Sequence, residues 1–283
     1  MKNNIKSELI KALHNRMFYI ALLLGVLVSI INIVENIQQR EIITEILLRD
    51  RIGISKNYES ISLFINWIAV DAGSLGYRIY YFIWPILAAL PFGWSYHQDR
   101  KNGVFNQIVS RSNLHSYYIS KYIAVFVSGG LAVAVPIVFN LLINALICPY
   151  NLPRVITSLV AVFDGSFMSE LFYTKPWIYA VIWCVVDFFF GGLAACFCFV
   201  IGTKPRLQTI VILTPYILFV LLDSAISFLE NFINISIELS PLRLAAAVTP
   251  NQNPEWIVLC TIVILSLVSF AIGYWQVKKH ELA

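Results

Sequence analysis

Six long runs of apolar residues constrain this chain more than any other feature. They cover residues 17–34, 77–94, 122–147, 177–201, 208–229 and 256–277. A helix needs about 20 largely apolar residues to cross the hydrocarbon core of a bilayer, whereas a barrel strand needs about ten residues of alternating polarity. The runs are continuous rather than alternating. We therefore expect an all-α, polytopic membrane protein whose six transmembrane helices form a single domain over residues 1–283.

The composition agrees with this fold class. Only 13% of the residues are charged and 59% are hydrophobic, whereas soluble domains carry about a quarter charged residues. The first run follows a basic leader, but it is longer than the core of a signal peptide, about 7–15 residues, and no small-residue cleavage site follows it. We expect it to be retained as a span.

Basic residues indicate the orientation of the spans. With the N-terminus inside, 12 of the 20 Lys and Arg residues fall in the short cytoplasmic segments. The positive-inside rule then places both termini in the cytoplasm. The net charge of +4 sits beside the spans, where it matches the anionic inner leaflet. We therefore expect membrane lipids as partners and no nucleic acid.

Residues 3–16 form an expected amphipathic helix before the first span. Ile5, Leu9, Leu13 and Met17 recur every four residues, which places them on one helical face. Such a helix lies along the inner surface of the membrane.

The cytoplasmic loop at residues 99–113 contains a second short amphipathic pattern. Val104, Phe105, Ile108 and Val109 make one apolar stripe on a two-turn helix. Such a helix can dock into a groove on a partner protein. It can equally lie flat against its own helix bundle or the lipid. Ser112 or Asn113 can cap a following helix that runs into the third span.

Motifs for chemistry are missing from the sequence. It contains no G-x-x-x-x-G-K-[ST] phosphate loop, no His-Glu-x-x-His zinc helix and no Gly-x-Ser-x-Gly nucleophile elbow. The four histidines are far apart in sequence, and this spacing argues against a shared metal site. We expect no catalytic residues, no metal site and no enzyme activity.

Two aspartates fall inside the apolar runs. Ionisable residues at membrane depth are costly and are functional candidates by default, so Asp187 and Asp223 are candidates for substrate contact or a proton site. Tyr216 shares the helical face of Asp223. The structural alternative is a hydrogen bond between helices, or an ion pair with an outer arginine such as Arg243 or Arg78.

Asn140 and Asn144 form a polar stripe in the third run. Asparagine side chains commonly bond across membrane helices, so they either pack helices or line a substrate path. Gly191 and Gly192 allow two helices to approach closely. The middle of the outer segment 230–254 is apolar enough to dip back into the bilayer.

The order Asp99, Gly103, Arg111 and Lys121 carries a family resemblance. An acidic residue, a glycine, an arginine-containing turn and a lysine opening the third span are similar to the cytoplasmic loop of type-2 ABC exporter permeases, the membrane subunits of ATP-binding-cassette exporters. The layout resembles that family over nearly the whole chain, whereas the motif covers only residues 99–121. The turn at residues 110–113 lacks the proline often found there, and the long outer loops leave the substrate open.

The resemblance implies a permease subunit that binds no cofactor itself. A separate ABC ATPase subunit would bind ATP and Mg, and a second permease copy would complete a homodimer or heterodimer. Residues 103–111 would be the coupling helix seated on the ATPase. The cargo would be an amphipathic peptide, antibiotic or lipid-like molecule, moved across a bacterial plasma membrane. The alternatives are a proton-coupled secondary transporter that uses Asp187 and Asp223, and a membrane module for peptide sensing or immunity.

Overall fold

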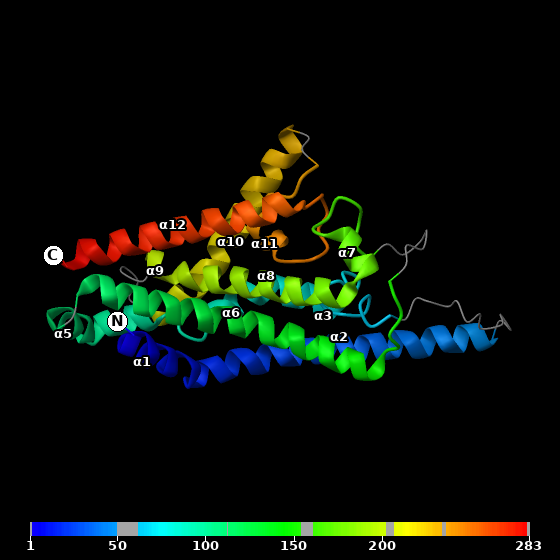
Figure 1. The fold of residues 1–283 in the computed structure, drawn as a ribbon, viewed down its shortest axis with the longest axis horizontal. Helices are drawn as coiled ribbons and strands as arrows, with labels where there is room; N and C mark the ends of the chain where they lie inside the picture. The colour runs from blue at the N-terminus through cyan, green and yellow to red at the C-terminus, as the bar shows by residue number, and fades with distance from the viewer. Residues whose placement is uncertain are drawn as a thin grey trace.

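The computed structural model describes residues 2–49, 62–111, 113–153, 161–201, 207–233 and 236–281. Within these residues the chain is helical, apart from one isolated bridge between Ile237 and Gln252. The long helices run lengthwise in an elongated bundle (Figure 1).

Five helices in the described residues are long and apolar enough to cross a membrane. They are α2 (Arg16–Arg49), α6 (Leu114–Ile147), α8 (Pro176–Cys196), α10 (Gln208–Ile233) and α12 (Glu255–Glu281). Each coincides with one of the six expected runs. The all-helical class is therefore confirmed, and the fold is compatible with a multi-pass membrane protein.

The second expected run forms a shorter helix than the others. Helix α3 (Leu75–Ala89) has 15 residues, which is about 22 Å at 1.5 Å per residue and less than the hydrocarbon thickness. Pro91 follows closely, and proline cannot continue a helix without losing a hydrogen bond. The chain turns at residues 90–94 and enters α4 (Ser95–Lys101). The sixth span therefore stays a prediction.

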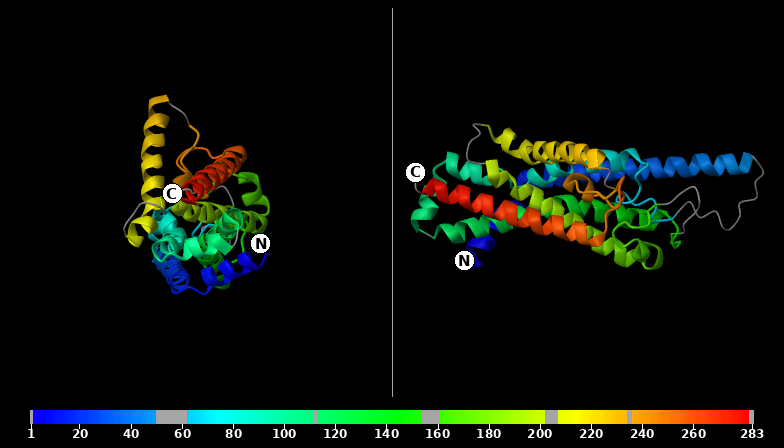
Figure 2. Two further views of the ribbon diagram at one scale, coloured as in Figure 1. Left: turned by 90° about the vertical axis from the view of Figure 1, so that its left-hand side faces the viewer. Right: turned by 90° about the horizontal axis from the view of Figure 1, so that it is seen from above.

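Helix α2 is longer than we expected from hydropathy. Hydropathy predicts an outer loop from residue 35, and the i,i+4 pair of Glu45 and Arg49 predicts a helix over residues 41–51 within it; instead α2 continues without a break through residue 35 to Arg49. No glycine or proline lies between Gly25 and Gly53 to end it. In Figure 2 the far end of α2 extends beyond its neighbours.

The short helices gather at the two ends of the bundle. Helices α1 (Lys2–Leu13) and α5 (Val104–Arg111) lie at the same end as the last turn of α12 (Figure 1). Helix α7 (Ser169–Thr174) lies toward the opposite end. We call these the inner and outer ends; the orientation in a membrane and the interfacial position of α1 stay predictions.

Helices α6 and α8 form the centre of the bundle through a seam of glycines. A Cβ at Gly129 of α6 would lie 2.4 Å from the Cβ of Ala195, and one at Gly191 of α8 would lie 2.8 Å from Val133 Cγ2. The close approach expected at Gly191 is confirmed, and it is made within the chain. By contrast, only 22% of the apolar window of α10 is buried, against 61% for α8, and α10 leaves the bundle at an angle (Figure 1).

Candidate functional site

A buried lysine joins three helices at the inner end. Lys121 of α6 is 2% exposed, and its Nζ lies 2.5 Å from Asp99 Oδ2 of α4 and 3.1 Å from Glu8 Oε2 of α1. The hydroxyl of Tyr117 donates a hydrogen bond to the same Asp99 oxygen, at 2.7 Å. We call Lys121, Glu8 and Asp99 the inner cluster. It brings together two of the four residues that carry the family resemblance.

The charges of the inner cluster hold Glu8 in its ionised form. Burial by itself raises the pKa of Glu8, but the ammonium groups of Lys121 and Lys11 outweigh it and lower the pKa below its ordinary value. The lysine also faces the ring of Phe92, whose centroid is 5.1 Å from Nζ. A desolvated lysine thus has two carboxylates and an aromatic face around it.

Gly103 makes the turn between α4 and α5. Its φ of +72° lies in the left-handed region that favours glycine, and no atom lies within 4 Å of an added Cβ. The backbone conformation, not a close contact, therefore accounts for glycine at this position.

The apolar stripe of α5 faces the chain itself. Phe105 is 4% exposed, and its ring contacts those of Tyr96 and Tyr117 at centroid distances of 5.9 and 5.5 Å. Ile108 and Val109 pack against the same core. Of the four residues of the apolar stripe, Val104 is the one that lies at the surface, with 36% of it exposed. The packing alternative accounts for the stripe, and the side chain of Arg111 lies outside the described part of the chain.

Apart from Val104, the exposed residues of α5 and of the turn before it are polar. They are Lys101, Asn102, Asn106, Gln107 and Ser110. Beside them, a cavity of about 400 Å³ lies between α1, α5 and α6, and both Glu8 and Gln107 line it. We call the exposed polar residues Lys101, Asn102, Asn106, Gln107 and Ser110 the polar face of α5.

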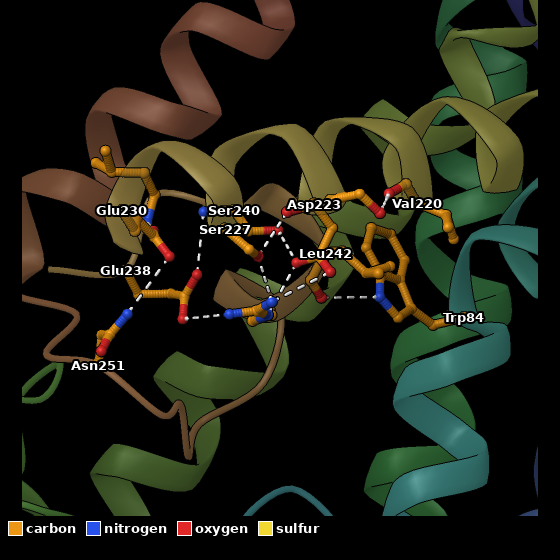
Figure 3. A network of polar contacts seen from close by, with 12 residues as sticks. Trp84, Val220, Asp223, Ser227, Glu230, Glu238, Ser240, Leu242 and Asn251 are labelled. Atoms are coloured by element: carbon orange, nitrogen blue, oxygen red, sulfur yellow. Dashed lines mark hydrogen bonds and ion pairs between the residues drawn. The ribbon is translucent and has the colours of Figure 1, made fainter. Parts of the chain in front are cut away.

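Arg243 is the centre of a second charged network, at the outer end. Its Nε lies 2.8 Å from Asp223 Oδ1, and its Nη1 lies 3.6 Å from Glu238 Oε2. The hydroxyl of Ser240 donates to Asp223 Oδ1 at 2.6 Å. Figure 3 shows these groups meeting between α10 and the segment that carries α11 (Pro241–Leu244). We call this set the outer network. It matches the ion-pair alternative for Asp223.

Glu230 extends the outer network, in which Glu238 is the most deeply buried acid. Glu230 accepts hydrogen bonds from the backbone N–H of Leu239, at 3.0 Å, and from Asn251 Nδ2, at 3.5 Å (Figure 3). Glu238 is fully buried. Burial raises its pKa, and the guanidinium of Arg243 partly offsets that rise. The network therefore ties the segment after α10 back onto that helix.

A pocket of about 520 Å³ opens beside the outer network, between α3, α10 and α11. Its charged groups are Asp223, Arg243 and Arg78, and Arg78 is exposed. Tyr216 does not line this pocket, but the ring of Tyr216 contacts the ring of Phe82, and Phe82 is a lining residue. The remaining lining is aromatic or apolar, apart from Thr249, and comprises Ala72, Tyr77, Tyr81, Phe82, Phe163, Leu242, Ala246, Val248 and Pro250. We call this the outer pocket.

Asp187 of α8 is separate from the outer network. It is 0% exposed, and neither carboxylate oxygen has a hydrogen-bond partner among the described residues. Neither Arg243 nor Arg78 pairs with it in that part of the chain, so the expected arginine partner is wrong for this aspartate. Asp223 thus has ionic and hydrogen-bond partners in the outer network, whereas Asp187 is buried without a hydrogen-bond partner among the described residues.

Asn140 and Asn144 support packing. Asn140 Nδ2 donates to Ser29 O at 3.1 Å and to Asn32 Oδ1 at 2.9 Å. Its Oδ1 accepts from Asn144 Nδ2 and from the backbone N–H of Ile68, both at 2.9 Å. These bonds hold residues 62–70 inside the bundle, where most side chains are fully buried. Neither asparagine lines the outer pocket.

One polar pair was missed in the sequence. Asn32 of α2 donates to Asp71 Oδ2 and to Ser74 Oγ, both at 2.9 Å. Asn32 lies inside the first apolar run, so it carried the same signal as Asn140.

No protein-family model matches the sequence, and no curated protein matches it. The fold and composition define a helical protein compatible with several membrane crossings.

Proposed function

We propose that the chain is the membrane-spanning permease subunit of a type-2 ABC exporter. It works with a separate ABC ATPase subunit, which binds ATP and Mg, and with a second permease copy. The observation that carries this proposal is the arrangement of residues 99–121. Asp99 and Lys121, which carry the family resemblance, form a partly buried ion pair, and Tyr117, which donates to Asp99, contacts Phe105 of α5.

The polar face of α5 is the proposed ATPase contact. A coupling element needs an exposed face for the partner and a firm connection to the spans. Phe105 supplies that connection, because its ring is enclosed by Tyr96 and Tyr117. Movement of α5 is then transmitted to α4 and α6, and through the glycine seam to α8. In this proposal there are six spans, α1 lies on the inner surface, and both termini are cytoplasmic.

The outer pocket supports an amphipathic cargo. Ligand sites are commonly apolar cavities of about 300–1,000 Å³ with a few placed polar groups. The outer pocket has this character, with aromatic walls and charged groups such as Arg78 at its rim. A peptide, antibiotic or lipid-like molecule has the matching combination of an apolar body and polar ends.

Co-purification tests the proposed ATPase contact. The tagged chain is isolated from membranes of cells that naturally carry it, and associated proteins are assayed for ATP hydrolysis. Lys101→Glu with Gln107→Glu places negative charge on the polar face of α5, and we expect the ATPase to be lost. Lys175→Glu makes the same kind of charge change on an exposed residue near α7 and should retain it. Absence of an ATPase from the unmodified chain, or its retention in the double variant, refutes the proposal.

A proton-coupled secondary transporter is the second candidate, and one observation favours it. Asp187 is buried without an ionic partner among the described residues, whereas Asp223 is held by Arg243. Uptake that proceeds without any ATPase and stops in Asp187→Asn would favour this candidate over the first.

A further inference from the structure

Three polar side chains follow one face of α8. Tyr179, Trp183 and Asp187 are spaced four residues apart, which places them in one row along the helix. All three are nearly or fully buried, at 1%, 0% and 0% exposed. The rings of Tyr179 and Trp183 stack with a centroid separation of 6.0 Å and an interplanar angle of 13°. The row therefore leads along a stack of aromatic rings to a carboxylate.

The polar atoms of this row have no partners among the described residues. The Tyr179 hydroxyl, Trp183 Nε1 and both oxygens of Asp187 lack hydrogen bonds there. The hydroxyl of Tyr81, on the facing helix α3, also lacks one. Leaving a buried polar group unsatisfied costs about 1–3 kcal/mol. A cluster of such groups at one place in a described core indicates a site built to contact a polar ligand.

Tyr77 and Tyr81 belong both to the lining of the outer pocket and to the surroundings of Asp187. Both residues line that pocket, and the carboxyl group of Asp187 is near enough to interact with both of their hydroxyls. Tyr77 is held in place, because its hydroxyl donates to Val248 O at 2.7 Å. The hydroxyl of Tyr81 makes no hydrogen bond of ordinary geometry in the described residues, and its polar neighbour is the indole of Trp183. A ligand in the outer pocket would therefore reach the carboxyl group of Asp187 past Tyr81.

The chemistry of these groups selects a cation with a single charge. A carboxylate attracts a cation, phenol and indole faces attract it further, and hydroxyl oxygens can accept hydrogen bonds from it. No group of three or more His, Cys, Asp or Glu side chains in the described residues could hold a metal ion. An ammonium group offers three donors or fewer and needs only one counter-charge. It suits one carboxylate surrounded by aromatic rings.

The outer network is a poorer place for the same ligand. Asp223 already accepts from Arg243 and Ser240, so an incoming cation would have to approach a guanidinium. Asp187 offers a carboxylate without that repulsion.

We propose that Asp187, at the end of the row that it forms with Tyr179 and Trp183 and near Tyr81, binds the protonated amine of an amphipathic cargo whose apolar body occupies the outer pocket. This inference rests on the proposed transport function, and it narrows the cargo to amine-bearing molecules.

Binding of a matched pair of probes tests the proposal. Phenethylammonium and 2-phenylethanol share one apolar body and differ in the charged amine. Their affinities for the purified chain in lipid nanodiscs are measured by isothermal titration calorimetry. We expect phenethylammonium to bind at least tenfold more tightly. Equal affinities for the two probes would overturn the proposal without any variant being made.

Variants then locate the amine. Asp187→Asn should abolish the preference for the charged probe, whereas Asp164→Asn, on an exposed outer residue, should retain it. Tyr81→Phe keeps the ring and Asp187 but removes one acceptor, and should reduce the preference severalfold. This second variant keeps the location testable if Asp187→Asn does not fold. A preference that survives in Asp187→Asn or is unchanged in Tyr81→Phe refutes the assignment.

The binding measurement is independent of the ATPase. An amine preference without a co-purifying ATPase refutes only the exporter assignment. A co-purifying ATPase without an amine preference refutes only the proposed cargo class.

Discussion

The inner cluster and the outer network have the same ionic composition and different access to water. Each places one cation between two carboxylates. At the inner end the side chain of Lys121 is 2% exposed. At the outer end the side chain of Arg243 is 29% exposed and that of its partner Asp223 is 20% exposed. The cation is therefore enclosed at one end of the bundle and partly open to water at the other, whereas each end has one carboxylate that is 20% exposed and one that is largely buried.

This difference indicates that the inner cluster and the outer network have different mechanical roles. Removing one partner from a buried ion pair leaves an uncompensated charge and is strongly destabilising, whereas an exposed pair contributes little. We infer that Lys121 fixes α1, α4 and α6 to one another. Arg243 instead forms an adjustable connection between α10 and the segment that carries α11.

The largest effect is expected from Lys121→Met. Two carboxylates, Glu8 and Asp99, would lose their buried counter-charge, which should cost about 3–5 kcal/mol of unfolding free energy. Lys11→Met is the matched control, since Lys11 pairs with the same Glu8 but is 57% exposed. It should cost less than about 1 kcal/mol. Thermal unfolding in detergent micelles measures both, and equal losses would show that burial does not distinguish the two lysines.

A smaller effect is expected from Arg243→Met. The pair with Asp223 is partly hydrated, and the buried Glu238 can take up a proton because burial already raises its pKa, so the loss should be about 1 kcal/mol, near the upper end for exposed pairs. Salt screens exposed charges more than buried ones. Raising the salt concentration should therefore reduce the difference in unfolding free energy between Arg243→Met and the unmodified chain. The corresponding difference for Lys121→Met should not change. An identical salt response in the two variants would contradict the comparison.

The smallest effect is a pH dependence of opposite sign at the two ends. Glu8 has a lowered pKa, so its contribution to stability is present above the ordinary value of 4.5 and is lost as pH falls through the folded-state pKa. Glu238 has a raised pKa, so its contribution is present below 4.5 and is lost as pH rises through the folded-state value.

Unfolding profiles of two glutamine variants separate these contributions. Glu8→Gln should flatten the plot of unfolding free energy against pH below pH 4.5. Glu238→Gln should flatten the same plot just above pH 4.5. Flattening on the same side of pH 4.5 in both variants would show that the two ends do not differ in this way.

The sequence predicts those parts of the fold that depend on local hydropathy. Five of the expected runs form long helices, and Asn113, one of the two candidate caps, caps α6 through its side chain. The unbroken course of α2 through residue 35 and the short length of α3 do not follow from hydropathy. Polar residues can continue a helix when nothing breaks it, and Pro91 can shorten one that hydropathy extends.

The site was predicted in its residues and less well in its contacts. Periodicity identified the stripe containing Phe105, but it does not specify whether a stripe faces a partner or its own bundle. The pairing of Asp223 with Arg243 is one of several alternatives that the sequence leaves open. The isolation of Asp187 and the bond from Asn32 to Asp71 depend on contacts between distant segments, which no local pattern contains.

The glycine seam between α6 and α8 has a genetic consequence. Every codon change that replaces a glycine adds at least one carbon. An added Cβ at Gly129, Gly130, Gly191 or Gly192 would come within 2.4, 2.6, 2.8 or 2.6 Å of a neighbouring atom. Missense alleles at these four codons should therefore be depleted among functional variants. Alleles at Gly73, where the nearest atom is 3.8 Å away, should persist, so random mutagenesis would mark the line along which the two helices meet.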